Sequence, residues 1–193
     1  LLGERGQFVL KGGDLLTPKT VSVTPITNYE NDTSTTPLEL GSYLYFPFTR
    51  GSFTGIREFS VNASTDNYDS GEVTSHVPQY IPSNVLDIAG STTENLICLV
   101  SNNTADETKN MYVYKYYWEG NQKVLSSWSK FTFPFKIRGI EFVDSDLYIV
   151  AAKNGKTILL KMPMEEKLVD DNTAFNTYLD MRTNDTYTTG NNG

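Results

Sequence analysis

The stretch at residues 111–133, MYVYKYYWEGNQKVLSSWSKFTF, predicts two β-strands joined by a turn at residues 119–122. Aromatic and β-branched side chains dominate the first strand, and a Gly-Asn pair supplies the turn. Because side chains alternate along a strand, Tyr112, Tyr114, Tyr116 and Trp118 lie on one face of the first strand. The opposite face is also largely apolar. Such a strand needs covering from two sides, which a sheet with one solvated face does not provide.

The order of the predicted strands repeats along the chain at intervals of about 50 residues, close to the spacing of propeller blades. Each unit has a short strand, then a strand that is apolar on both faces, then a third strand. The units are 38–40, 43–48 and 53–61, then 85–88, 96–100 and 111–118, then 137–142, 147–152 and 156–162. The predicted fold is all-β, with antiparallel meander units that form part of a β-propeller, in which neighbouring sheets cover both faces. A β-sandwich, which buries one face of each sheet, is the alternative.

Length and composition are those of one large domain. The chain has 193 residues, of which 38% are hydrophobic and 12% aromatic, enough for a substantial core. We expect residues 1–193 to form one propeller-like region of a longer protein, because the chain starts at Leu1 and ends in a polar run. Residues 163–193 are acidic and polar, and we interpret them as a segment leading into the next part.

The charge balance argues against a protein that coats DNA. The formal net charge is −7, from 16 basic and 23 acidic residues, whereas a protein that coats DNA is normally basic. The sequence has no run of about 18 apolar residues, so we expect no membrane span.

The sequence offers little reactive chemistry. Cys98 lies in a strand-like apolar run and is interpreted as a small buried side chain, and His76 as a loop residue. One cysteine and one histidine cannot build a Cys/His metal cluster. The acidic pairs at 144/146, 165/166 and 170/171 are interpreted as solvated. We therefore predict no catalytic, cofactor-binding or metal-binding residue, and a protein that is not an enzyme.

Several blocks of the sequence occur in a familiar order. They are RGQFVL at 5–10, RGSFTGIREF at 50–59, TSHVPQYIP at 74–82, GSTTEN at 90–95, the stretch at 111–133, and YLDM at 178–181. In this order the chain resembles the tail tubular protein B family, the nozzle proteins of T7-like short-tailed bacteriophages. The likeness covers nearly the whole chain, and the TSHVPQYIP block and the Tyr-rich hairpin are its most specific parts.

The resemblance implies a structural virion protein of the tail, several times longer than this chain and with a β-propeller-like region. Other copies of itself would form a hexameric ring, a tail adaptor protein would sit above it and tail fibres at its side. Phage DNA would pass through the central channel during ejection without sequence-specific binding. The family contributes no catalytic residue. The alternative is a β-propeller domain that binds or cleaves host-surface glycan.

Overall fold

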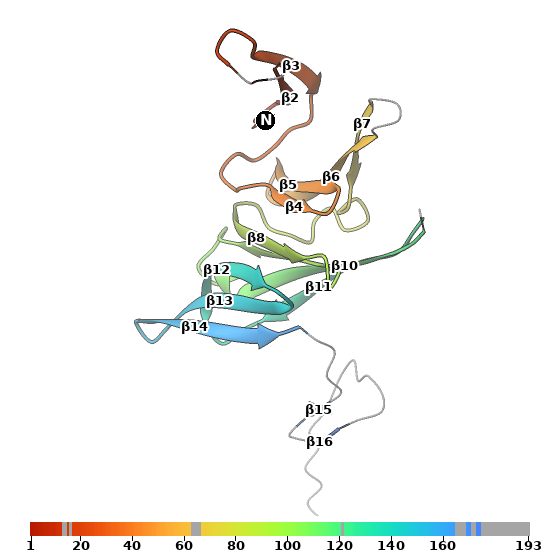
Figure 1. Ribbon diagram of the computed structural model, residues 1–193. Helices are drawn as coiled ribbons and strands as arrows, with labels where there is room; N and C mark the ends of the chain where they lie inside the picture. Colours follow the sequence, from red (N-terminus) through yellow and green to blue (C-terminus); the bar gives the residue numbers. More distant parts are fainter. Residues whose placement is uncertain are drawn as a thin grey trace, which may run out of the picture.

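The computed structural model describes residues 1–12, 15, 17–62, 67–120, 122–164, 169–170 and 173–174. Over this part the chain forms antiparallel β-sheets, with a single short 3-10 helix, η1, at Glu107–Lys109. Figure 1 shows the sheets stacked one on another in chain order. The prediction of an all-β protein made of antiparallel meander units is confirmed, and within the described residues the stack stays open, without closing into a ring or a barrel.

The strands belong to four main sheets and one small pair. Sheet A contains β1 (Leu2–Gly3), β2 (Gly6–Lys11) and β3 (Ser22–Thr27). Sheet B contains β4 (Leu38–Leu40), β5 (Tyr43–Arg50), β6 (Phe53–Asn62) and β7 (Asn67–Glu72). Sheet C contains β8 (Val85–Ser91), β9 (Leu96–Ser101), β10 (Asn110–Glu119) and β11 (Gln122–Thr132). Sheet D contains β12 (Lys136–Val143), β13 (Asp146–Lys153) and β14 (Lys156–Pro163), and β15 (Val169–Asp170) pairs with β16 (Thr173–Ala174).

Tight turns set the hairpins within these sheets. Gly120 follows β10 with a φ of +59°, a left-handed backbone that glycine adopts without steric cost. Asn154 and Gly155 join β13 to β14 with φ values of 51° and 71°, the two left-handed positions of a type I′ turn. The β10–β11 pairing shifts by one residue after Tyr117, where Val124 is the extra residue of a β-bulge.

The middle strands of sheet C, β9 and β10, are buried on both faces over most of their length, as predicted for the first strand of the stretch at 111–133, whereas β11 is largely exposed. Between sheets B and C lies a first core, which includes Tyr45, Ile56, Ile97, Leu99, Tyr112, Tyr114 and Tyr116. Between sheets C and D lies a second core, which includes Cys98, Val100, Met111, Val113, Leu147, Ile149 and Ala151. Every residue of β9 is buried, because alternate side chains enter the two cores. Trp118, the last member of the aromatic face, is partly buried against the first core.

Sheet D is covered on one face by the described residues. Leu147, Ile149 and Ala151 of β13 are buried in the second core, whereas Val150 between them is 39% exposed. The strand at 147–152 is thus apolar on both faces but covered on one within the described residues, as expected where a piece of a propeller leaves its end sheet without the next neighbour.

The first strands of sheets B, C and D, β4, β8 and β12, lie next to one another along one edge of the stack. Two polar contacts join them there. The Thr35 hydroxyl, just before β4, donates to the Val85 carbonyl at 3.1 Å. The Ile140 amide donates to Oδ2 of Asp87 at 2.9 Å.

Most of residues 163–193 lies outside the described residues, so the interpretation of this segment and the extent of the domain stay predictions. Among the described helical residues, none forms a helix long and apolar enough to cross a membrane.

Candidate functional site: contacts between neighbouring sheets

Among the residues that the structure describes, the reactive groups considered in the sequence lie apart from one another. Cys98 is buried in β9, and this burial raises the pKa of its thiol to about 12, which keeps it protonated. His76 is exposed in the turn after β7. Asp146 forms an ion pair with Lys161 at 2.6 Å, and the side chains of the pairs at 165/166 and 170/171 lie outside the described part. Among the described residues no group of His, Cys, Asp and Glu could hold a metal ion.

A largely buried polar contact joins sheet B to sheet C. Lys123, at the start of β11, places its Nζ 2.5 Å from Oε2 of Glu58 on β6. The same carboxylate oxygen accepts the hydroxyl of Tyr45 on β5 at 2.6 Å. The side chains of Lys123 and Glu58 are only 16% and 11% exposed, so the pair is largely withdrawn from solvent. A charge in such a position needs a partner, because water no longer neutralises it.

Aromatic rings enclose this ion pair. The Lys123 ammonium lies 4.9 Å from the ring centre of Trp118 and 5.8 Å from that of Tyr114, within the range of cation–π attraction. Trp118 in turn stacks on Tyr43 of sheet B, with ring centres 5.7 Å apart. Burial raises the pKa of Tyr45 above its ordinary value, and the hydrogen bond to Glu58 and the charge of that group act in the same direction.

A second contact lies further along the same pair of sheets. Trp128 of β11 donates its indole N–H to the carbonyl of Val73, just after β7, at 2.9 Å. Together with the ion pair, it joins β11 of sheet C to sheet B, while Thr35 and Asp87 make contacts along the edge formed by the first strands. Together these described contacts fix the orientation of sheet B on sheet C. None of them activates a nucleophile.

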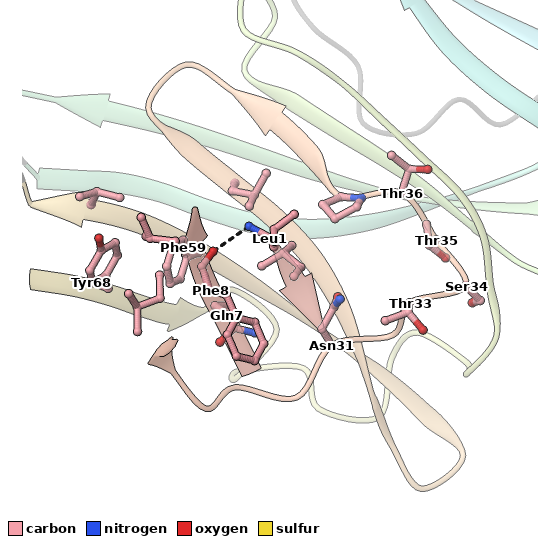
Figure 2. Close-up of a pocket in the computed structure, with 16 residues that line it drawn as sticks. Leu1, Gln7, Phe8, Asn31, Thr33, Ser34, Thr35, Thr36, Phe59 and Tyr68 are labelled. Carbon is pink, nitrogen blue, oxygen red and sulfur yellow. Dashed lines mark hydrogen bonds between the residues drawn. The ribbon is translucent and has the colours of Figure 1, made fainter. Parts of the chain in front are cut away.

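A pocket separates sheet A from sheet B (Figure 2). Its volume is about 550 Å³, within the range of small-molecule sites. Three rings, from Phe8, Phe59 and Tyr68, contribute to its lining, and hydroxyl groups of the linker at 33–36 line another side. Asn31 also lines it, and its side-chain Oδ1 is buried without a hydrogen-bond partner in the described structure.

Sequence reasoning missed the Lys123–Glu58 contact. The two residues are 65 positions apart, and neither forms part of a recognisable motif. The only available signal was a lysine beside the turn of an aromatic hairpin, which reads equally well as a solvated side chain.

Comparison with known proteins identifies the family to which the chain belongs. A family model described as bacteriophage nozzle protein matches residues 1–192. The curated tail tubular protein gp12 of Escherichia phage T7 is 28% identical over 183 residues, which cover 93% of this chain and 23% of that protein. The chain thus spans less than a quarter of the length of this curated relative.

These matches define the class as a structural protein of the phage tail. The chain belongs to the bacteriophage nozzle protein family. This membership confirms the resemblance found in the sequence and agrees with the expected location in the tail of the virion.

Proposed function

We propose that this chain forms part of the tail nozzle through which a phage genome leaves the particle, and that it acts by structure and not by catalysis. The observation that carries the proposal is the family match over residues 1–192. The stack of sheets fastened to each other by buried contacts suits a rigid part of such a tube.

Sheets B, C and D are proposed to be blades of a β-propeller. Two features support this. The first strands β4, β8 and β12 lie together along one edge, as the innermost strands of neighbouring blades do. The middle strands of sheet C, β9 and β10, also contribute to cores on both faces, which two sheets packed as a sandwich would not require.

The proposed partners are those of a tail tube. Copies of the chain in a hexameric ring, a tail adaptor protein and tail fibres would surround it, and DNA would pass without sequence-specific binding. The net charge of −7 is compatible with a conduit, because a surface that held phosphates tightly would slow DNA exit.

Phage complementation tests the main proposal. A phage lacking the parent gene would be supplied with the gene carrying Gly90→Val, which disturbs the β4–β8 contact, or with Gly71→Val as a matched control. We expect the first to give particles with incomplete tails or without DNA release, and the second to give infectious particles. Normal plating with the gene segment deleted would contradict a role in the nozzle.

The pocket between sheets A and B favours a second candidate, the binding of a host-surface glycan. Aromatic rings beside hydroxyl and amide groups suit sugar rings, and the described lining contains no Asp or Glu, so binding is favoured over cleavage. Incubation with capsular polysaccharide or lipopolysaccharide, followed by reducing-end analysis and a binding titration, would separate the two. Release of reducing ends would show catalysis and contradict the non-enzymatic proposal.

A further inference from the structure

The pocket between sheets A and B is lined by two buried amide side chains whose oxygens are bonded differently. Gln7 is 1% exposed, and its Oε1 accepts hydrogen bonds from the Thr27 hydroxyl at 2.6 Å and the Tyr29 amide at 3.0 Å. Gln7 therefore serves the fold, because it holds the linker that follows β3. Asn31 is 5% exposed, yet its Oδ1 has no hydrogen-bond partner among the described residues. A buried amide oxygen in that state is costly unless a bound molecule donates to it.

The backbone around Asn31 is held from both sheets. The Asn31 amide donates to the carbonyl of Glu4, between β1 and β2, at 3.0 Å. The next amide, that of Asp32, donates to the carbonyl of Pro47 on β5 at 2.8 Å. The unpaired side chain thus stands on a fixed support at the wall of the pocket.

Hydroxyl groups of the linker line the pocket beside Asn31. Those of Ser34 and Thr35 donate to protein oxygens within the fold. Those of Thr33 and Thr36 form no hydrogen bond to another described residue. The pocket therefore presents one amide oxygen and two hydroxyls that a bound molecule could use.

The remaining wall is mostly apolar. Phe8 of sheet A and Phe59 and Tyr68 of sheet B contribute rings, and the last two are stacked with centres 6.0 Å apart. In the view of Figure 2, Asn31 lies between these rings and the linker hydroxyls. A sugar matches this arrangement, because its ring has an apolar C–H face that packs on an aromatic ring and hydroxyls around its rim.

The charge of the lining restricts the kind of sugar. The described lining contains no Asp, Glu, Lys, Arg or His side chain. The α-amino group of Leu1, also at the wall, already donates to the Phe8 carbonyl at 2.8 Å. A charged sugar would lose water here without meeting a side chain of opposite charge, and the net charge of −7 further opposes an anion.

We propose that this pocket binds an uncharged sugar residue, with a hydroxyl that donates to Oδ1 of Asn31 and an apolar face against Tyr68. The inference rests on glycan binding, the second candidate function, and names the class of glycan and the residue that anchors it. Walls from both sheets contact the sugar, whereas neither described core includes a residue of sheet A. Binding therefore also fixes sheet A on sheet B.

Ligand-observed NMR titration of the 193-residue chain tests the class of sugar. The uncharged probes are the methyl glycosides of glucose, galactose and mannose and N-acetylglucosamine, and the acidic probes are glucuronic acid and N-acetylneuraminic acid. At least one uncharged probe should bind saturably, and about tenfold or more tighter than either acid. Equal or tighter binding of an acid would overturn this inference and leave glycan binding standing. No saturable binding of any probe would contradict both.

Two variants test the anchor. Asn31→Leu should weaken binding about tenfold or more without lowering the urea midpoint, because the sugar loses its acceptor while the fold loses an unpaired buried oxygen. Asn102→Leu makes the same change at an exposed loop position and should bind like the parent chain. Tyr68→Ala should also weaken binding, and it carries the test if Asn31→Leu does not fold.

Hydrogen exchange adds a readout of the link between the sheets. Saturation with the uncharged probe should slow exchange of the β2 amides in the parent chain and in Asn102→Leu, but not in Asn31→Leu. Binding by Asn31→Leu that equals the parent's, or an equal loss in Asn102→Leu, would overturn the proposal.

Discussion

Lys123 and Glu58 come from different sheets and lie 65 residues apart, yet their Nζ and Oε2 atoms are 2.5 Å from each other. The contact ties the hairpin of sheet C to the middle of sheet B, and Tyr45 completes it by donating to the same carboxylate. Neither sheet could slide along the other without separating these charges in a partly dry environment.

Removing one partner of this pair should destabilise the protein. Lys123→Met keeps much of the aliphatic stem but removes the cationic partner of Glu58, which keeps its bond from the Tyr45 hydroxyl, so we expect the free energy of unfolding to fall by about 1–3 kcal/mol. Urea titration followed by fluorescence measures this. The double variant Lys123→Met/Glu58→Leu should recover part of the loss, because no unpaired charge remains. A single variant within about 0.5 kcal/mol of the parent would show that the pair contributes little.

Gly90 in β8 packs directly against the side chains of β4. A Cβ at this position would lie 2.6 Å from Cδ1 of Leu40 and 2.9 Å from Cδ2 of Leu38. We expect Gly90→Ala to lower the free energy of unfolding by about 1–3 kcal/mol through overpacking.

Gly71 in β7 provides the matched control for this substitution. A Cβ there meets no neighbouring atom within 4 Å, so Gly71→Ala should change stability by less than about 0.5 kcal/mol. Equal losses for the two variants in thermal unfolding would mean that general strand effects, and not the β4–β8 contact, explain the result.

Alkaline pH should weaken the sheet B–sheet C contact. Burial raises the pKa of Tyr45 and Tyr116 above the ordinary value of 10.0, and burial with the Glu107 hydrogen bond raises that of Tyr112. The unfolded chain therefore loses these phenol protons at lower pH than the folded chain. Their contribution to stability is fully present below about pH 10 and falls as the pH rises above it.

Urea midpoints measured between about pH 8 and pH 11 test this dependence. Tyr45→Phe should make the decline shallower, because one buried phenol is removed, whatever its effect on stability at neutral pH. A midpoint that stays constant over this range, or an unchanged slope in Tyr45→Phe, would contradict the expectation.

The outer face of sheet D should make the 193-residue chain prone to self-association. Val143, Val150 and Leu159 are 52%, 39% and 67% exposed, and an uncovered apolar sheet face favours association. We expect the chain to bind a hydrophobic dye and to sediment faster at higher concentration. Val150→Thr/Leu159→Thr should reduce both signals, whereas a monomeric, dye-silent parent chain would contradict this and favour the sandwich alternative.

The sequence by itself determined the strands. Alternating side chains and turn residues predicted β5, β9 and β10, and apolar residues on both faces predicted that sheet C needs cover from two sides. These signals are local, because they depend on residues next to each other along one strand. The polar strand β7, NYDSGE, escaped prediction for the same reason: its pairing with β6 decides its conformation, and its own residues do not.

Only the tertiary structure decided which surfaces meet. The stacking of sheets B, C and D brings Lys123 to Glu58 and Trp128 to the carbonyl of Val73, over separations of 65 and 55 residues. It also leaves Tyr117 exposed while Tyr116, its neighbour in sequence, is buried. Such contacts depend on which strands of neighbouring sheets face each other, and no local sequence pattern encodes that.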